Sequence, residues 1–102
     1  MAAYVKVANA DELQPGGAKL VEAGDQKVAL FNVDGTCYAI SDTCTHRGGP
    51  LSEGALDNDV VTCPWHGATF DVRTGEVTKT PASESVGCYS VRVSGGDIEI
   101  EV

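Results

Sequence analysis

The chain has 102 residues, and fifteen Asp and Glu against seven Lys and Arg give it a formal net charge of −8. This length predicts one domain with a modest core. The acidic balance argues against a nucleic-acid-binding protein or one that docks on anionic membranes, because both functions use basic patches. It favours brief docking on a basic protein partner, with an association that weakens as salt rises.

The beginning of the chain lacks the basic segment and apolar run that mark a secretory signal. No apolar run in the sequence is long enough to span a bilayer as a helix. Four cysteines in such a chain favour metal chemistry over a disulfide framework. These features predict a soluble, cytoplasmic protein.

The first third of the chain has the pattern of short strands. Residues 5–7 predict an N-terminal strand, and residues 9–13 predict one helical turn. Residues 27–33 and 36–40 predict a β-hairpin, because the Asp34-Gly35 pair between them is favoured in two-residue turns.

The C-terminal residues predict a second hairpin. Residues 88–93 alternate in polarity, a glycine-containing turn follows at 94–96, and residues 97–102 resume the alternation. In this last segment Ile98 and Ile100 share one face while acidic residues occupy the other, which predicts a half-buried strand.

The middle of the chain, from about residue 42 to 81, is different. It is rich in glycine and has brief strand-like runs at 60–62 and 68–71, with a turn at 73–76 between two short strands. We interpret it as an insertion in an antiparallel β sandwich or barrel. The chain, residues 1–102, is thus expected to be a single all-β domain.

Two short motifs in this insertion each pair a cysteine with a histidine. Cys44 and His46 form the first, and Cys63 and His66 form the second. One thiolate and one imidazole from each loop suit a two-iron cluster in which sulfur ligates one iron and nitrogen the other. These four residues are the candidate metal and cofactor ligands, and no residue is assigned a catalytic role.

A structural zinc site is the main alternative for these four residues, since two cysteines and two histidines also bind zinc. Zinc sites usually group like ligands, as in C-x₂₋₄-C followed by H-x₃₋₅-H, whereas each motif here is mixed. The mixed motifs favour the iron–sulfur interpretation.

The segments Cys44-Thr45-His46-Arg47-Gly48-Gly49-Pro50-Leu51 and Cys63-Pro64-Trp65-His66-Gly67 resemble the two cluster loops of the Rieske family. Chain length and flanking strands are similar to those of the soluble Rieske-type ferredoxins of bacterial ring-hydroxylating dioxygenase systems. The resemblance implies a Rieske-like antiparallel sandwich or barrel with an inserted cluster-binding subdomain at about 42–81. It also implies a Rieske-type 2Fe–2S cluster.

The resemblance further implies a role for each ligand. Cys44 and Cys63 would bind the buried iron, and His46 and His66 would bind the outer iron through Nδ1. Pro81 falls where the family has a third loop that closes over the cluster.

As a member of this family the chain would be a monomeric one-electron carrier. It would take electrons from an NAD(P)H-dependent flavoprotein reductase and pass them to a terminal aromatic-ring-hydroxylating oxygenase. It would not be an enzyme itself, because the sequence has no second metal set of the kind that oxygen chemistry needs. A different function within the family is a small subunit built permanently into an oxidoreductase such as a nitrite reductase.

A comparison with the respiratory branch of the family predicts a low reduction potential. In the cytochrome bc complexes each cluster loop has an additional Cys, and Gly49 and Trp65 match those positions here. A Ser and a Tyr of that branch, which donate to cluster and ligand sulfur, match Ala68 and Phe70. Each missing donor removes roughly 1 kcal/mol or more of stabilisation from the reduced state. We therefore expect a potential in the low half of the Rieske range of roughly −150 to +300 mV.

The two remaining cysteines, Cys37 and Cys88, fall in predicted strands. We expect them to be small core residues, which is how free cysteine usually behaves. A disulfide between them stays open as an alternative. Leu51 and Trp65 are expected to provide apolar cover for the cluster.

Overall fold

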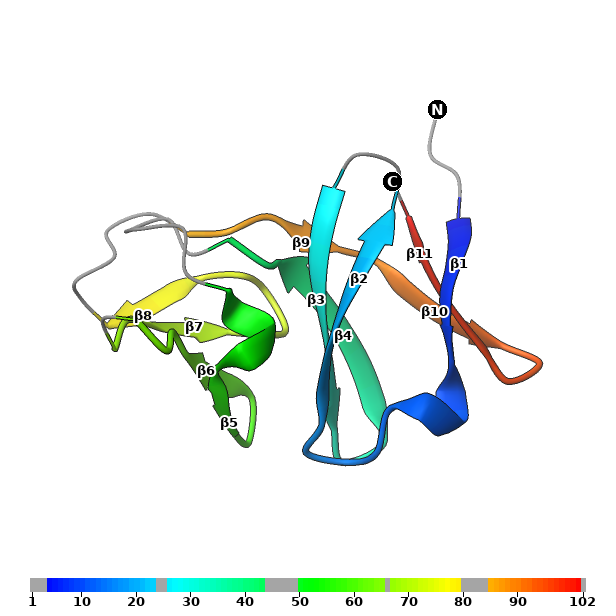
Figure 1. Ribbon diagram of the computed structural model, residues 1–102, viewed down its shortest axis with the longest axis horizontal. Coiled ribbons are helices and arrows are strands. Elements are labelled where there is room, and N and C mark those ends of the chain that lie inside the picture. Colours follow the sequence, from blue (N-terminus) through cyan, green and yellow to red (C-terminus); the bar gives the residue numbers. More distant parts are fainter. Residues whose placement is uncertain (1–3, 24–25, 44–49, 66, 80–84, 102) are drawn as a thin grey trace.

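The computed structural model describes residues 4–23, 26–43, 50–65, 67–79 and 85–101. Within these residues, eleven strands form three antiparallel sheets, and there are two single-turn 3-10 helices (Figure 1). The all-β antiparallel fold expected from the sequence is confirmed. Neither of the described helices is long and apolar enough to cross a membrane.

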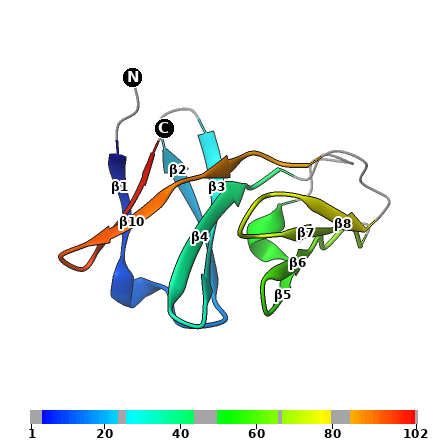
Figure 2. The same cartoon turned by 180° about the vertical axis from the view of Figure 1, so that it is seen from behind.

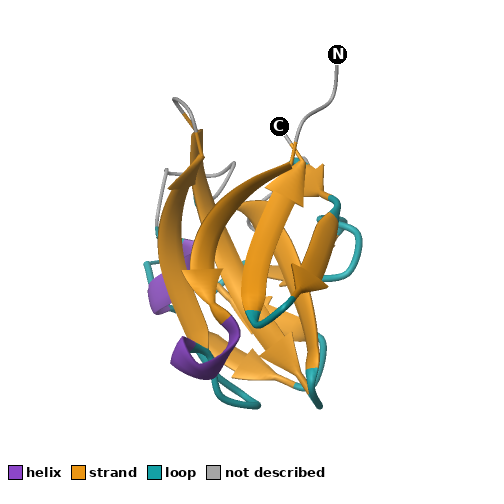
Figure 3. Ribbon diagram, turned by 90° about the vertical axis from the view of Figure 1, so that its right-hand side faces the viewer, coloured by secondary structure: helices purple, strands orange, loops and turns teal. Residues whose placement is uncertain are grey.

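Three sheets divide the strands between them. The first sheet has the strand order β1 (Tyr4–Asn9), β11 (Asp97–Glu101) and β10 (Val91–Ser94). The second has the order β2 (Ala18–Ala23), β3 (Gln26–Val33), β4 (Thr36–Ser41) and β9 (Cys88–Tyr89). The third has the order β5 (Ala55–Asp57), β6 (Val60–Thr62), β7 (Thr69–Asp71) and β8 (Val77–Lys79). The short helices are η1 (Ala10–Glu12) and η2 (Leu51–Glu53), which Figure 3 shows beside the sheets.

The second sheet is the middle layer of the molecule, as the two opposite views in Figures 1 and 2 show. Along its strand β3, Val28 and Leu30 enter the core shared with the first sheet, while Ala29 and Phe31 enter the core shared with the third. All four side chains are fully buried. Because both faces of β3 are covered, its sequence is a continuous apolar run and not an alternation.

The predicted β3–β4 hairpin is confirmed, with Val33 paired to Thr36 at its end. Asp34 and Gly35 have φ angles of 52° and 95°. Two positive φ angles in succession are what a two-residue type I′ turn requires, and Asp-Gly adopts them at low cost. The alternation predicted for the last strand is also confirmed, since Ile98 and Ile100 are fully buried.

The segment 88–93 differs from its prediction, because it is not one strand. It breaks at Ser90, so that β9 pairs with β4 through Ile40 and Cys88, while β10 pairs with β11. The Ser90 carbonyl accepts a hydrogen bond from the Glu101 amide at 3.0 Å. One alternating segment thus serves two sheets and joins them at the edge of the sandwich. Strands β2 and β5 were not predicted at all.

The β5-β6-β7-β8 sheet lies between β4 and β9 along the chain, although β4 and β9 pair directly. A whole sheet is therefore inserted between two neighbouring strands of the middle layer. The packing of Leu51, Val61 and Phe70 against Phe31 joins this inserted sheet to the middle sheet.

The expectation that Cys37 and Cys88 are core residues is wrong for Cys88. Cys88 is exposed and its thiol donates to the Arg73 carbonyl at 3.4 Å, whereas Cys37 is partly buried against the first core. Both are free. Cys88 is paired with Ile40, three positions from Cys37 on β4. At ~3.3 Å per residue this offset alone exceeds the roughly 7 Å limit between bridged Cα atoms, which rules out the disulfide.

Candidate metal centre

Cys63 is the one predicted ligand that lies within the described residues. It follows β6 directly, is 2% exposed, and belongs to the core between the middle and third sheets. Its thiol is free. A buried thiol that makes no disulfide suits an inner iron, because water is already excluded around it. Cys44, His46 and His66, like Pro81 and Gly49, lie outside the described residues.

The second motif lies on a turn at the end of a β-hairpin. The Cys63 amide donates to the Ala68 carbonyl at 2.7 Å, and the Gly67 amide donates to the Cys63 carbonyl at 3.1 Å. Strands β6 and β7 continue directly on either side, with Thr62 paired to Thr69. Gly67 has a φ of 80°, which a residue with a side chain adopts only with strain. Among the described residues, two backbone hydrogen bonds close this turn.

The first motif lies between two residues that are bridged to each other, Thr43 and Pro50. The Leu51 amide donates to the Asp42 carbonyl at 2.7 Å, and the Ser52 amide donates to Oδ1 of Asp42 at 2.8 Å. These bonds bring the chain before Cys44 and the chain after the motif to the same place.

A close approach at Gly54 brings the two motif-bearing segments together. A Cβ atom at this position would overlap the carbonyl oxygen of Thr62, the residue before Cys63. Ala55 pairs with the same Thr62 in the β5–β6 ladder. The segment that follows the first motif in the chain therefore runs beside the strand that leads to Cys63, at one end of the inserted sheet.

Leu51 and Trp65, the two residues expected to cover the site, differ in exposure. Leu51 is fully buried in the same cluster as Cys63. Trp65 is 57% exposed. Leu51 thus excludes water from the Cys63 side of the site, while Trp65 presents a large apolar surface to solvent.

The described cations are largely neutralised by neighbouring carboxylates. Ion pairs join Lys6 to Asp97 at 3.1 Å, Lys19 to Glu12 at 2.9 Å, Arg92 to Glu99 at 2.7 Å, and Arg73 to Asp59 at 2.9 Å and Asp71 at 3.0 Å. The hydrogen bond from Arg73 holds the pKa of Asp71 below its usual range. The surplus of carboxylates therefore sets the sign of the surface potential.

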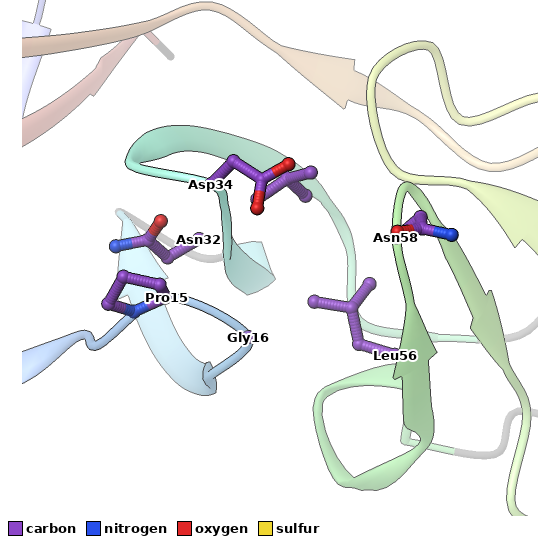
Figure 4. Close-up of a pocket in the computed structure, with 7 residues that line it drawn as sticks. Pro15, Gly16, Asn32, Asp34, Leu56 and Asn58 are labelled. Carbon is purple, nitrogen blue, oxygen red and sulfur yellow. The ribbon is translucent and has the colours of Figure 1, made fainter.

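A cavity of about 250 Å³ lies between the middle and third sheets, away from the Cys63 turn. Figure 4 shows Pro15, Asn32 and Asp34 on one side of it and Leu56 and Asn58 on the other. Asn32 is already committed, since its amide donates to the Leu13 carbonyl and accepts from the Gly35 amide, each at 2.8 Å. Among the described residues no three His, Cys, Asp or Glu side chains gather as a metal site.

The structural roles of Asp42 and Gly54 in this region were not predicted from the sequence, which offered Asp42 only as one of several acidic residues around the site. Asp42 is separated from Cys44 by one residue, so its position offered a signal. The position of Gly54 offered no such signal, because the carbonyl oxygen that it accommodates belongs to Thr62 on β6.

Comparison with known families matches residues 3–90 to the model of the Rieske [2Fe-2S] domain. The chain is 44% identical over 99 residues to the biphenyl dioxygenase ferredoxin subunit of Pseudomonas sp. strain KKS102, which covers 96% of this chain and 91% of the relative.

Two solved structures are similar over nearly the full length. The ferredoxin of carbazole 1,9a-dioxygenase from Nocardioides aromaticivorans IC177 has a TM-score of 0.92 at 33% identity, covering 96% of both chains. A complex of reduced oxygenase and oxidised ferredoxin in carbazole 1,9a-dioxygenase contains a chain with a TM-score of 0.90 at 39% identity. That match covers 95% of this chain and 91% of the other.

These matches favour iron and sulfide over zinc at the four candidate ligands, since the matched domain is defined by its cluster. Relatives of the same length are named as ferredoxin components, which carry electrons and do not catalyse reactions. The protein is likewise an electron carrier with a Rieske-type 2Fe–2S cluster as its cofactor. The chain belongs to the Rieske [2Fe-2S] family.

Proposed function

We propose that the protein is the ferredoxin component of a ring-hydroxylating dioxygenase system and delivers single electrons to a terminal oxygenase. The observation that carries this is a match of nearly full length, in both directions, to a biphenyl dioxygenase ferredoxin. A relative of the same fold is named in complex with its oxygenase. A permanent subunit of a nitrite reductase has no such support.

The proposed ligands are Cys44 and Cys63 for the inner iron, and His46 and His66, through Nδ1, for the outer iron. Full burial of Leu51 and near-complete burial of Cys63 support an inner position for the Cys63 thiolate. The bound cluster supplies a site that gains and loses one electron. The chain contributes a hairpin turn closed by backbone hydrogen bonds and a buried apolar environment on the Cys63 side.

The proposed docking surface surrounds His46 and His66 and includes Trp65. Exposed aromatic side chains are frequent anchors at protein interfaces, and Trp65 precedes a proposed outer ligand directly. The net charge of −8 favours a partner with a basic rim, whose attraction speeds encounter at low salt. The same surface would receive electrons from an NAD(P)H-dependent flavoprotein reductase.

We further propose that the protein is a cytoplasmic monomer. The free thiols of Cys37, Cys63 and Cys88 suit a reducing compartment. Analytical ultracentrifugation tests the monomer, and a dimer that persists on dilution would contradict it.

We also propose a potential in the low half of the Rieske range. Ala68 and Phe70 are fully buried beside Cys63 and have no hydroxyl that donates to sulfur. The reduced state therefore lacks two stabilising bonds of the kind expected in the respiratory branch.

The central test is to purify the protein aerobically, to count iron, sulfide and zinc, and to record its EPR spectrum after dithionite reduction. Two irons and two sulfides per chain with a rhombic spectrum are expected. One zinc and no EPR signal would contradict the proposed cofactor ligands.

The docking surface is tested by Trp65→Ala, with Val93→Ala as the matched control. Val93 is exposed to a similar extent, at 53%, but lies on β10 in the first sheet. In a reconstituted reductase–oxygenase assay, Trp65→Ala is expected to raise the KM for the ferredoxin about tenfold, corresponding to roughly 1.4 kcal/mol. An equal effect of both variants would argue against a role specific to Trp65.

A further inference from the structure

Asp42 is the buried carboxylate among the described residues, with 5% of its surface exposed. It follows β4 directly and extends the pairing of β3 with β4 by one hydrogen bond, from its own amide to the Lys27 carbonyl at 3.0 Å. Asp42 is thus anchored to β3, a strand whose interior is fully buried on both faces.

From this anchor Asp42 binds the chain that returns from the first motif. Its carbonyl accepts from the Leu51 amide at 2.7 Å, and its Oδ1 accepts from the Ser52 amide at 2.8 Å. These are the first two amides of η2, which have no acceptor within their own helix. Pro50 precedes them and has no capping side chain. Asp42 therefore caps η2 from across the base of the loop.

We infer that Asp42 is a positioning residue for the cluster: by capping η2 it joins the two ends of the segment that bears Cys44 and His46, and so fixes that segment relative to Cys63. This inference rests on the proposed ligand set. The Asp42 carboxylate acts as a hydrogen-bond acceptor for Ser52. Residues outside the ligand shell that orient ligands typically change metal affinity about 10- to 100-fold when removed.

Asn32 provides a matched control, because it is the other buried polar side chain among the described residues, at 7% exposure. It also binds a backbone amide through Oδ1 at 2.8 Å, but that amide belongs to Gly35 in the β3–β4 turn. Loss of either side chain removes a buried acceptor of a backbone amide, and loss of Asn32 also removes its donation to the Leu13 carbonyl. A purely structural role predicts the same behaviour for both residues.

The experiment compares wild type, Asp42→Ala, Asp42→Asn and Asn32→Ala, each loaded with cluster. The readouts are the rate of iron loss to a chelator, the EPR g-values, and unfolding in urea. Asp42→Ala is expected to lose iron at least about tenfold faster than wild type, with shifted g-values. Asn32→Ala is expected to unfold at lower urea with unchanged g-values. Asp42→Asn keeps an Oδ1 acceptor and is expected to retain iron as wild type does.

Equal iron loss in Asp42→Ala and Asn32→Ala would overturn the inference, because general destabilisation would then explain both. Iron loss in Asp42→Asn as fast as in Asp42→Ala would also overturn it, since the acceptor would not be the cause. If Asp42→Ala does not fold, the rate of hydrogen exchange at the Ser52 amide of the wild type tests whether Asp42 caps η2. Slow exchange supports the cap, and exchange as fast as in an unfolded chain overturns it.

The failure of this inference can be distinguished from that of the proposed function. A wild-type protein that assembles no 2Fe–2S cluster would contradict both the proposed function and the role of Asp42. Wild-type protein with a rhombic EPR spectrum, together with an Asp42→Ala protein indistinguishable from it, would remove the role of Asp42 alone.

Discussion

The two segments that carry the Cys/His motifs are closed at their bases in different ways. The second is the end of a β-hairpin, and the bond between the Cys63 amide and the Ala68 carbonyl continues a ladder of backbone pairs. The first follows β4 and returns through η2, so a single isolated bridge between Thr43 and Pro50 flanks it in place of a strand ladder. Its base depends on Asp42, whose carbonyl and carboxylate bind the returning chain.

This difference shows that a small all-β fold can carry two similar motifs on segments whose ends are held together by different interactions. Apart from the glycine at Gly67, a hairpin turn of this kind depends little on its side chains, because its bonds are made by the backbone. The base of the first loop has a backbone bridge between Thr43 and Pro50 but also depends on one buried side chain, so a change of that side chain removes part of its closure. We therefore expect substitutions outside the ligands to act more strongly on the first loop than on the second.

The largest expected effect comes from Cys63 itself. Cys63→Ala is expected to abolish cluster assembly, because it removes a ligand at a site that water does not reach. Iron and sulfide analysis measures the loss. Cys37→Ala, which removes a free cysteine of the other core, is expected to retain both. Full cluster content in Cys63→Ala would refute the ligand assignment.

A smaller effect is expected where the two segments touch. Gly54→Ala places a methyl group on the Thr62 carbonyl and is expected to destabilise the protein by about 1–3 kcal/mol, as overpacking usually does. Urea unfolding provides the measurement. Gly87→Ala is the control, because a Cβ there meets no atom within 4 Å. If both variants were equally stable, the close approach would not constrain the fold.

The hairpin support of the second loop allows a test of the potential without loss of the cluster. Ala68→Ser with Phe70→Tyr is expected to raise the potential by roughly 40 mV for each new bond of about 1 kcal/mol to sulfur. Both positions are fully buried, so each hydroxyl needs a partner. Redox titration followed by EPR measures the change. An unchanged potential with lowered stability would mean that no sulfur lies within reach.

The smallest effect is expected at the far end of the same hairpin, where Arg73 joins Asp59 and Asp71. The folded-state pKa of Asp71 is lowered by this hydrogen bond. A carboxyl with a lowered folded pKa adds stability above its unfolded pKa and loses it as pH falls through the folded value. Arg73→Gln should therefore be slightly less stable at neutral pH, with a difference from wild type that shrinks as the pH falls through and below the usual pKa range of an Asp carboxyl. A difference constant across that range, in urea unfolding, would contradict this.

Particular residues show how far prediction from sequence extends. The Asp34-Gly35 turn and the strand with Ile98 and Ile100 were predicted correctly, because turn geometry and alternation are local properties. The break at Ser90 was not predicted, because polarity alternates through it without interruption. Of the four proposed ligands, the structure tests the surroundings of Cys63 and finds it buried and free.

The sequence by itself determined the family and its cofactor, because two Cys/His motifs, each with one cysteine and one histidine at short spacing, indicate the ligand type without knowledge of the fold. It also determined the hairpins, whose signals lie within a few residues. Tertiary structure alone decided that β3 is covered on both faces, that Gly54 meets Thr62, and that Asp42 closes the first loop. Each of these depends on contacts between different strands or turns of the folded chain, and local residue preferences carry no information about such partners.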